Sequence, residues 1–377
     1  RIPEGMMQGQ PFVLREWQKE IIRPVYGDLG ENGLRRTRKA IFSVGKKNGK
    51  GLALDTPLPT PGGWTTMGDV SVGDVLFDES GHQCNVVFTS GVKRLDCYLV
   101  TFSNGESIVC DEEHLWLTTC LIQQPGAKKK YPRIKQPLKQ VRNVKTIYDT
   151  QKCVNGSTNN HSIDVIDPLV LPEMGLPLNP YVLGVWLGDG DSDAARVSCG
   201  SQDVDEIVAI LTREGQDTSV AQERGRKTWR VGLSAGRRGN MADRVITKLR
   251  SLGLLFNKHI PPLYLRASVS QRLALLQGLM DTDGTCDKRG RAQEWSTINE
   301  RLLVGFCELL SSLGIKYSVR EKPLRCNGKP IKGTGYYVQF CCLRDILPVF
   351  RLKRKLKRQK KTTDRVMRSR SRTIQIT

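Results

Sequence analysis

Several features that mark common protein classes are missing from this sequence. Its 377 residues include 4 histidines and 11 cysteines, and no two cysteines stand in a Cys-x-x-Cys pair. Zinc fingers and zinc ribbons need such pairs, so those classes are excluded, and we expect the cysteines to be reduced, buried thiols. The sequence also has no apolar run long enough to span a bilayer and no signal-peptide pattern at its start. We therefore expect a soluble cytoplasmic protein with no membrane partner.

Acidic residues are few compared with basic ones. The sequence has 38 Asp and Glu against 59 Lys and Arg, which gives a net charge of +21 at pH 7. The excess is concentrated in residues 351–372, which hold 12 basic residues and one acidic residue, and a second basic cluster covers residues 128–145. Such runs are usually solvated or disordered, but they also bind phosphate backbones. The length of the chain fits two or three domains.

One motif occurs twice in the sequence. Tyr181-Val-Leu-Gly-Val-Trp-Leu-Gly-Asp-Gly and Leu275-Leu-Gln-Gly-Leu-Met-Asp-Thr-Asp-Gly each predict an apolar helix that ends in an Asp-Gly pair. Small residues four apart share one helix face, so the two helices can cross with their backbones in close contact. The aligned positions are Gly184 with Gly278, Gly188 with Thr282, Asp189 with Asp283, and Gly190 with Gly284.

Asp189 and Asp283 come at the C-terminal ends of these predicted helices. A carboxylate is disfavoured at the negative end of a helix dipole unless a cation lies there. Paired carboxylates that hold divalent ions are the usual equipment for hydrolysing a phosphodiester. The alternative, an ordinary amphipathic helix with a glycine cap, suits either copy alone. Two copies, 94 residues apart (283 − 189), instead indicate a duplicated half-domain that binds metal through both acids.

The two motifs resemble those of a monomeric LAGLIDADG homing endonuclease. The first copy departs from the family's lettering, with Trp186 and Leu187 in place of Ile and Asp, but it keeps the acid before the last glycine. The resemblance implies double-stranded DNA as the substrate and Mg²⁺ held by Asp189 and Asp283.

Two flanking segments agree with this resemblance. Residues 257–262 (NKHIPP) look like the Lys-x-Ile-Pro segment that precedes the second motif in intein-borne members, and residues 309–317 resemble the helix and strand that follow it. The resemblance makes Lys258 and Lys316 candidate basic residues beside the scissile phosphates. Either lysine taken alone would more often be a solvated surface residue.

Residues 1–50 look like the N-terminal end of a phage terminase large subunit. A predicted helix carries Trp17 and Ile21, and a predicted strand at 40–44 leads into Gly45-Lys-Lys-Asn-Gly-Lys50. A strand followed by a Gly-Lys loop begins a P-loop, which needs Ser or Thr next to hold Mg²⁺. Gly51 follows instead, so the motif is broken one residue before its metal ligand. The break indicates an insertion.

The inserted element resembles an intein. Residues 51–78 read as short strands separated by Pro and Gly turns, like the first intein block. Residues 105–117 resemble the block that holds the splicing histidine, here His114. Alone, His114 would more often be a hydrogen-bonded loop residue, but its position between the first block and the endonuclease motifs favours the splicing role.

Three residues make the element look like a class 3 intein. Inteins usually begin with Cys or Ser, whereas Gly51 offers no nucleophile, and Asp111 stands where Thr is usual. Trp116, two residues after the histidine, completes the pattern. In that class the first nucleophile is a cysteine near the C-terminal end of the intein, paired with this tryptophan. Core packing would also account for Trp116, and the two roles can coexist.

By this resemblance the peptide bond between Lys50 and Gly51 is the upstream splice junction. His114 would polarise its carbonyl or protonate the leaving nitrogen, because a neutral imidazole suits proton transfer near pH 7. Asp111 would orient the junction. The distant cysteine, the terminal Asn and the host Ser or Thr are not in the sequence. We therefore expect residues 1–377 to splice only with a C-terminal intein and host segment as partner.

The predicted fold is mixed. An all-β splicing domain of the Hint type, shaped like a horseshoe, is joined to an α/β LAGLIDADG endonuclease whose halves are related by a pseudo-twofold axis, so that the endonuclease works as a monomer. The expected divisions are a host segment, a splicing region, a basic connector, the endonuclease, and a basic arm that leads into the C-terminal splicing region, at residues 1–50, 51–120, 121–166, 167–350 and 351–377.

The basic arm is expected to bind DNA phosphates through charge. Its first basic residues are Arg351, Lys353, Arg354, Lys355, Lys357 and Arg358. The expected target is an intein-less terminase gene in the bacterial host of a phage or prophage. Two alternatives remain open: a DNA-binding scaffold that has lost cleavage, and an ATP-dependent packaging motor. Intact Asp189 and Asp283 argue against the first, and the incomplete P-loop argues against the second.

Overall fold

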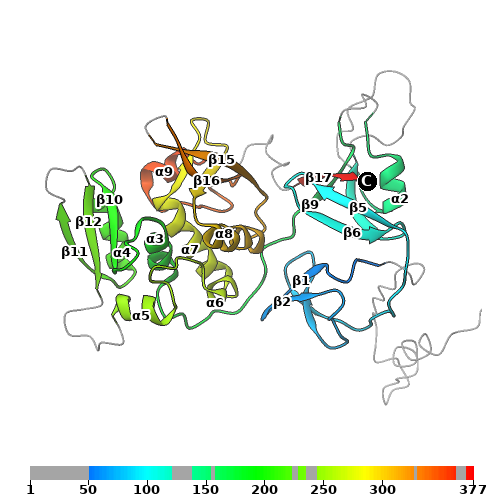
Figure 1. Ribbon diagram of the computed structural model, residues 1–377, viewed down its shortest axis with the longest axis horizontal. Coiled ribbons are helices and arrows are strands. Elements are labelled where there is room, and N and C mark those ends of the chain that lie inside the picture. The colour runs from blue at the N-terminus through cyan, green and yellow to red at the C-terminus, as the bar shows by residue number, and fades with distance from the viewer. Residues whose placement is uncertain are drawn as a thin grey trace, which may run out of the picture. The chain divides into compact units, whose positions relative to one another are not determined.

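The computed structural model describes residues 51–120, 138–153, 158–222, 228–234, 244–326, 329–361 and 371–377 (Figure 1). The expected host segment, residues 1–50, lies outside the described residues, and so does Lys50. Within the described part of the chain, no helix is long and apolar enough to cross a membrane.

The part predicted to act in splicing, called the splicing part below, is built from antiparallel strands. It comprises residues 51–120, 138–153, 158–164 and 371–377. A six-stranded sheet has the order β6-β5-β17-β9-β7-β8. Two separate hairpins, β1-β2 and β3-β4, precede β5 in the chain. One helix, α2 (Val144–Asp149), packs on the sheet and begins at Asn143, whose side chain accepts a hydrogen bond from the Thr146 N–H. The strands are β1 Pro57–Thr60, β2 Gly63–Thr66, β3 Val75–Phe77, β4 Gln83–Asn85, β5 Cys97–Phe102, β6 Ser107–Asp111, β7 Leu115–Cys120, β8 Leu138–Asn143, β9 His161–Asp164 and β17 Ser371–Ile376.

A small apolar core holds this sheet together. Strands β5, β6 and β7 alternate between exposed and buried side chains, as expected for a sheet with one covered face. The buried side chains come from β5, β6, β17 and α2, and they are Val100, Phe102, Cys110, Val144, Ile147, Ile374 and Ile376.

Residues 121–166 were predicted to form a basic connector, but the described residues of this range are not a connector. Its second part contains β8, α2 and β9, which pair and pack within the splicing sheet. The polar composition suits β8, an edge strand on which none of the described side chains is buried. The splicing part therefore extends to Asp164 and includes β17 from the far end of the chain.

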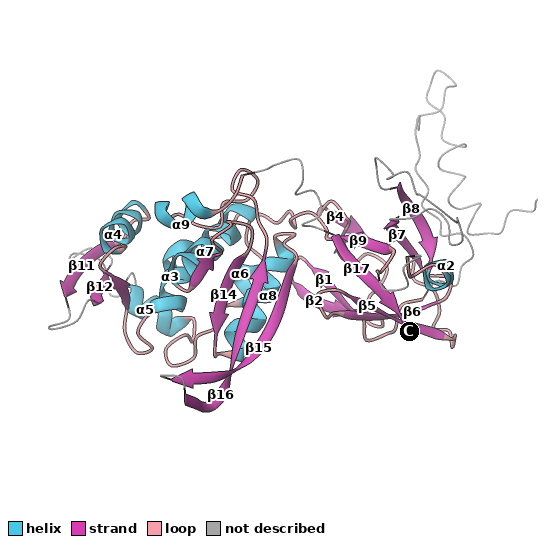
Figure 2. Cartoon of the chain, turned by 90° about the horizontal axis from the view of Figure 1, so that it is seen from above, coloured by secondary structure: helices cyan, strands magenta, loops and turns pink. Residues whose placement is uncertain are grey.

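The part predicted to be the endonuclease, called the endonuclease part below, consists of two halves. In each half a central helix is followed in the chain by the strands of one sheet. The first sheet has the order β10-β12-β11, and the second has the order β13-β14-β16-β15. Figures 1 and 2 show α3 and α7 side by side between the two sheets. The elements of the first half are α3 Pro180–Asp189, β10 Arg196–Gly200, α4 Val204–Arg213, β11 Asp217–Gln222, β12 Thr228–Ser234 and α5 Val245–Ser251. Those of the second are α6 Pro262–Leu265, α7 Val269–Thr282, β13 Gly284–Cys286, β14 Gln293–Thr297, α8 Glu300–Ser312, β15 Tyr317–Cys326, β16 Lys329–Phe340 and α9 Lys353–Arg358.

The two central helices have clear start signals in the sequence. Helix α3 begins with Asn179, whose side chain accepts hydrogen bonds from the next N–H groups, followed by Pro180 at its first position. Helix α7 begins with a capping box formed by Ser268 and Gln271. Residues 181–187 of α3 are all buried, since the helix is covered on every side by α7, the first sheet and α4.

Candidate functional site

The two motif helices cross at their glycines. A Cβ atom placed on Gly184 would lie 2.4 Å from the Leu275 carbonyl oxygen, and one placed on Gly278 would lie 2.3 Å from the Tyr181 carbonyl oxygen. Such distances are shorter than any real Cβ contact, so both positions require glycine. The close crossing brings the C-terminal ends of α3 and α7 together, as the repeated motif predicted.

Asp189 and Asp283 stand at these two ends. Asp189 is the last residue of α3, and Asp283 caps α7. Burial raises the pKa of both carboxyls, and the charge of Asp189 helps to raise the pKa of Asp283 to about 6. A second negative charge is unfavourable here unless a cation compensates it.

The donor set fits a divalent cation that is shared with the substrate. Among the described residues, no three His, Cys, Asp or Glu side chains gather into a group that could hold a metal ion. The protein therefore offers two carboxylates, Asp189 and Asp283, and phosphate and water oxygens would complete the shell. Mg²⁺ is commonly held in this way, by one or two carboxylates together with substrate phosphates.

Two lysines flank the carboxylates, Lys258, which is half-buried, and Lys355, which is buried. Lys258 Nζ donates hydrogen bonds to the carbonyls of Gly188 and Gly190, at 3.1 and 2.7 Å. Lys355 Nζ lies 2.7 to 3.0 Å from four carbonyl oxygens around the end of α7. Both ammonium groups lower the pKa values of Asp189 and Asp283, and burial in turn lowers their own, that of Lys355 to about 8. In each half, one carboxylate and one lysine thus lie at the C-terminal end of the motif helix.

Lys355, and not Lys316, is the partner of Lys258. Lys316 comes just before β15, and the charge that acts on it comes from Arg372. The prediction placed the second lysine directly after α8, whereas the chain returns to α7 through α9. The duplicated spacing could have identified it, because Lys258 follows Asp189 by 69 residues (258 − 189) and Lys355 follows Asp283 by 72 (355 − 283).

Asp281 anchors the segment that carries Lys355. Its carboxylate accepts hydrogen bonds from the N–H groups of Arg351 and Leu352, at 3.1 to 3.2 Å, and from the Tyr181 hydroxyl at 2.8 Å. Burial raises its pKa to about 6. The sequence analysis missed this residue, although it is the extra acid in the second motif.

The structure places the first turns of the predicted DNA-binding arm against other parts of the protein. Arg351 is paired with Glu214, Arg354 forms two hydrogen bonds of 2.5 Å with Asp203, and Lys355 is 7% exposed. These side chains attach α9 to α4 of the first half, because α9 lies against acidic side chains at both ends of that helix. The exposed basic residues of α9 are Lys353, Arg354, Lys357 and Arg358. Residues 362–370 lie outside the described residues.

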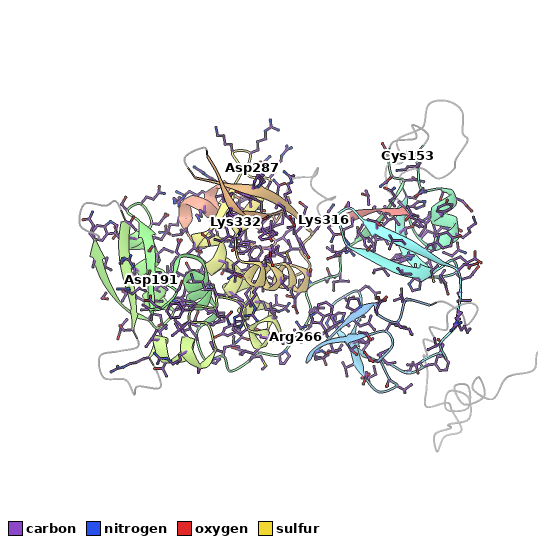
Figure 3. All side chains as sticks on the ribbon, viewed as in Figure 1. Cys153, Asp191, Arg266, Asp287, Lys316 and Lys332 are labelled. Carbon is purple, nitrogen blue, oxygen red and sulfur yellow. The ribbon has the colours of Figure 1, made fainter. Side chains whose placement is uncertain are left out.

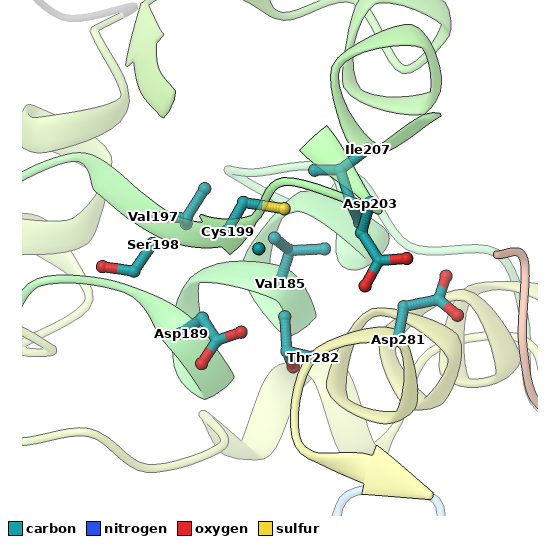
Figure 4. A pocket seen from close by; sticks show the side chains of 10 residues that line it. Val185, Asp189, Val197, Ser198, Cys199, Asp203, Ile207, Asp281 and Thr282 are labelled. Carbon is teal, nitrogen blue, oxygen red and sulfur yellow. The ribbon is translucent and has the colours of Figure 1, made fainter. Parts of the chain in front are cut away.

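A small pocket opens beside Asp189 (Figure 4). It is lined by residues of α3, β10, α4 and α7, among them Cys199, Asp203 and Thr282. Burial raises the pKa of the Cys199 thiol to about 11, with Asp203 and Asp189 adding to the shift. The thiol is therefore protonated at neutral pH and is a poor metal ligand.

The expected splicing residues also gather in the splicing part. The Gly51 N–H donates to Asp111 Oδ2 at 2.7 Å, and the Asp111 N–H donates to the Gly51 carbonyl at 3.1 Å. Asp111 is 3% exposed. The rings of His114 and Trp116 meet edge to face with centroids 5.2 Å apart. The first residue of the predicted intein and its acid are thus brought together, and the histidine ring lies against Trp116.

Comparisons with known proteins support both parts. The LAGLIDADG-like domain family matches residues 270–370. A replicative DNA helicase DnaB from Mycobacterium intracellulare is 39% identical over 284 residues, which are 74% of this chain and 45% of the helicase. The crystal structure of the MchDnaB-1 intein is 42% identical and covers 25% of this chain and 76% of its own, with a TM-score of 0.18. A structure of I-DmoI in complex with DNA and calcium is 15% identical, covering 48% of this chain and 95% of its own, with a TM-score of 0.29.

The chain combines a Hint-type splicing fold with a LAGLIDADG endonuclease fold, so the predicted fold class is confirmed. The comparisons thus support an intein that carries an embedded LAGLIDADG homing endonuclease domain.

The predicted terminase host is not supported by these comparisons. The curated relatives are DnaB helicases, from Mycobacterium intracellulare and Mycobacterium leprae. The chain spans less than half the length of either one. The P-loop fragment on which the terminase prediction depends lies in residues 1–50, outside the described residues.

Proposed function

We propose that this chain is a site-specific DNA endonuclease that uses Mg²⁺ to break both strands of an intein-less copy of its host gene. The observation that carries the proposal is the meeting of Asp189 and Asp283 at the crossing of α3 and α7, with Lys258 and Lys355 beside them. Bound Mg²⁺ supplies charge that stabilises the attacking and leaving oxygens of an in-line displacement.

The lysines have two roles in this proposal. Each neutralises the carbonyl dipoles at the end of a motif helix, so that a carboxylate and a phosphate can approach what is otherwise a negative helix end. Each also adds positive charge next to the scissile phosphates, where charge builds up in the transition state. Burial lowers their pKa values, but Lys355 at about 8 is still mainly charged at pH 7.

The two sheets supply a surface for DNA. In the first, Val197 and Val231 face the core, so the alternate residues of β10 and β12 face outward. In the second, Trp295 and Val338 are buried in the same way. The outward residues are polar or charged and include Arg196, Ser198, Arg230, Glu294, Arg320, Tyr337 and Gln339. Strands with such side chains can read base edges in the major groove.

The DNA target can be inferred from the sequence that a homing enzyme must not cut, which is its own gene. An enzyme that cut its own gene would destroy its carrier, so the site is a sequence that the intein interrupts. That sequence spans the codons for residues 46–50 and the host codons after the intein, whichever host protein they encode. Two unlike half-domains should read a long, imperfectly palindromic site.

A cleavage assay tests this function. Two plasmids are compared, one with the uninterrupted host sequence and one with the intein gene in place, each with Mg²⁺ or with EDTA. We expect linear product from the uninterrupted plasmid with Mg²⁺ alone. Asp189→Asn and Asp283→Asn should abolish cleavage and leave DNA binding largely unchanged, because the lost groups hold metal and not bases. Equal cutting of both plasmids, or cutting by the double variant, would refute the proposal.

We further propose that residues 51–120, 138–164 and 371–377 act in class 3 protein splicing. The contact that favours it is the short hydrogen bond from the Gly51 N–H to Asp111. In the first step a downstream cysteine thiolate attacks the carbonyl carbon of residue 50. The bond from that carbon to the Gly51 nitrogen breaks, a thioester forms, and the nitrogen leaves as an amine after taking a proton, which His114 can supply. Asp111 holds the nitrogen in place for this step.

A further inference from the structure

We propose that Asp191 is a positioning residue that holds Arg196 and Arg230 against the DNA strand cut on the Asp189 side, so that the two strands are cut at unequal rates. The inference rests on the proposed endonuclease function and adds an asymmetry between the two halves of the site.

The cluster is built around one carboxylate. Asp191 Oδ2 lies 2.8 Å from Arg196 Nε and 2.7 Å from Arg230 Nη1, and its Oδ1 lies 3.0 Å from the same Arg230 nitrogen. The Asp191 side chain is 17% exposed, whereas those of Arg196 and Arg230 are 50% and 35% exposed. The acid is therefore inside the cluster, and the two guanidinium groups are presented outward.

The cluster also belongs to the metal-binding end of the first half. Asp191 follows Asp189 by two residues, at the point where α3 gives way to the sheet (Figure 3). Its charge acts on Lys258, together with those of Asp189 and Asp283. A phosphate bound near Asp189 would thus meet two exposed arginines held by one acid, and guanidinium groups bind phosphate in a forked geometry.

The second half has no such cluster at the matching positions. Gly190 pairs with Val197 in the first half, and Gly284 pairs with Trp295 in the second, so the two sheets can be aligned residue by residue. On the next strand of each sheet, Arg230 pairs with Ser198 and Tyr337 pairs with Ser296, so these two strands can be aligned as well. Under this alignment Asp191 matches Thr285, Arg196 matches Glu294, and Arg230 matches Tyr337.

The difference in charge is large. The first half presents two arginines and one acid where the second presents a single acid, Glu294. The second sheet does carry exposed basic residues, Lys332 on β16 and Arg320 and Lys322 on β15, but none stands at a position that matches Arg196 or Arg230. Phosphate charge is therefore better stabilised on the Asp189 side, and the strand bound there should be cut first.

Strand-resolved kinetics test the proposal with the full chain and Mg²⁺. The substrate is a duplex of the uninterrupted host sequence with a different label on each strand, and the initial rate is measured for each. We expect unequal rates in the unchanged protein. Arg230→Gln should slow the faster strand about tenfold while slowing the other much less, since one charge-assisted contact is lost. Asp191→Asn should reduce the ratio of the two rates by about threefold, because both arginines keep their charge but lose their anchor.

Two further variants separate local from general effects. Glu294→Gln removes the opposing charge in the second half and should speed the slower strand. Arg213→Gln removes an exposed arginine from the end of α4, and the ratio should stay as it is. Equal rates in the unchanged protein, or an equal loss on both strands in Arg230→Gln, would overturn the inference. Failure of the unchanged protein to cut with Mg²⁺ would instead count against the proposed function.

Discussion

At the scale of single residues, the two acids of the site are kept at a cost to folding. Burial and mutual repulsion raise the pKa of Asp283 to about 6 from an ordinary value of 3.8. Between these two pH values the folded chain holds a proton that the unfolded chain has released. The free energy of unfolding therefore falls as pH rises through this window, and the loss is complete at pH 7.

Replacing this acid should stabilise the metal-free protein. Asp283→Asn removes a charge that is partly buried beside Asp189. We expect the free energy of unfolding at pH 7 to rise on the order of 1–2 kcal/mol, after allowance for solvent screening. The gain should disappear below about pH 4, where the carboxyl is protonated in both states. Urea denaturation at the two pH values measures it.

Magnesium should reverse this order of stability. The ion binds the folded state through both carboxylates, so it should raise the melting temperature of the unchanged protein and have little effect on Asp283→Asn. An equal response of the two proteins to Mg²⁺ would mean that Asp283 does not hold the ion.

The two lysines should differ in what they contribute to stability. Lys355→Met leaves four buried carbonyls without their donor, whereas Lys258→Met leaves two. We expect losses of about 2–4 and 1–2 kcal/mol in the free energy of unfolding, respectively. Both should lose most DNA cleavage, and Lys316→Met should keep it. A Lys316→Met protein without cleavage would restore the original pairing with Lys258.

Residue identities could be predicted where a motif fixes them. Asp189, Asp283 and Lys258 stand where the repeated motif and the segment before its second copy indicated, and Asp111 contacts Gly51 as expected. Lys316 was predicted from a common pattern, a lysine near a strand, whereas the position of Lys355 beside both acids depends on how α9 folds back. That return depends on tertiary contacts with Asp203 and Asp281, which no local pattern reveals.

At the scale of elements, the crossing of α3 and α7 sets the geometry of the site. The two helices approach closely because Gly184 and Gly278 present no side chains to each other. The crossing fixes the distance between the carboxylates, so any widening would move Asp189 away from Asp283. Stability and cleavage should therefore respond together to changes at this contact.

Gly184→Ala tests the crossing. Alanine is the better helix former by about 1 kcal/mol, so an isolated helix would gain from the change. Here the added Cβ would lie 2.4 Å from the Leu275 carbonyl, and we expect a net loss of about 2–4 kcal/mol. Gly175→Ala is the matched control, because no heavy atom lies within 4 Å of the added Cβ. Similar unfolding midpoints for the two variants would show that the helices can separate freely.

Element type was predictable where the apolar pattern is strong. The motif helices follow from sequence periodicity, and the helix and strand indicated at 309–317 match the end of α8 and the start of β15. The strands β8 and β9 did not, because they are short and one face is polar. The intramolecular contacts of the first turns of the basic arm could not be predicted for a related reason: charge density indicates phosphate binding, but it does not identify acidic side chains that stand far away in sequence.

At the scale of the whole molecule, we expect the proposed splicing reaction to depend on the contact between Gly51 and Asp111. In the full gene product, Asp111→Ala should slow cleavage at the upstream junction about tenfold or more, since a buried charged acceptor of the Gly51 N–H is lost. Glu112→Ala, next to it and exposed, should leave the rate unchanged. Gel analysis of spliced and unspliced product over time measures both. A normal rate in Asp111→Ala would remove Asp111 from the mechanism.

Strand β17 determines when the splicing sheet can be completed during synthesis of the chain. It lies between β5 and β9 in the splicing sheet, yet 206 residues separate Asp164, the end of β9, from Ser371 at its start. At ribosomal speeds of about 5–20 residues per second, β9 emerges roughly 10–40 seconds before β17 can join it. The endonuclease has time to form as a separate domain while the splicing sheet is still incomplete. If the chain splices as proposed, excision cannot begin before residues 165–370, which include the proposed endonuclease, have been synthesised.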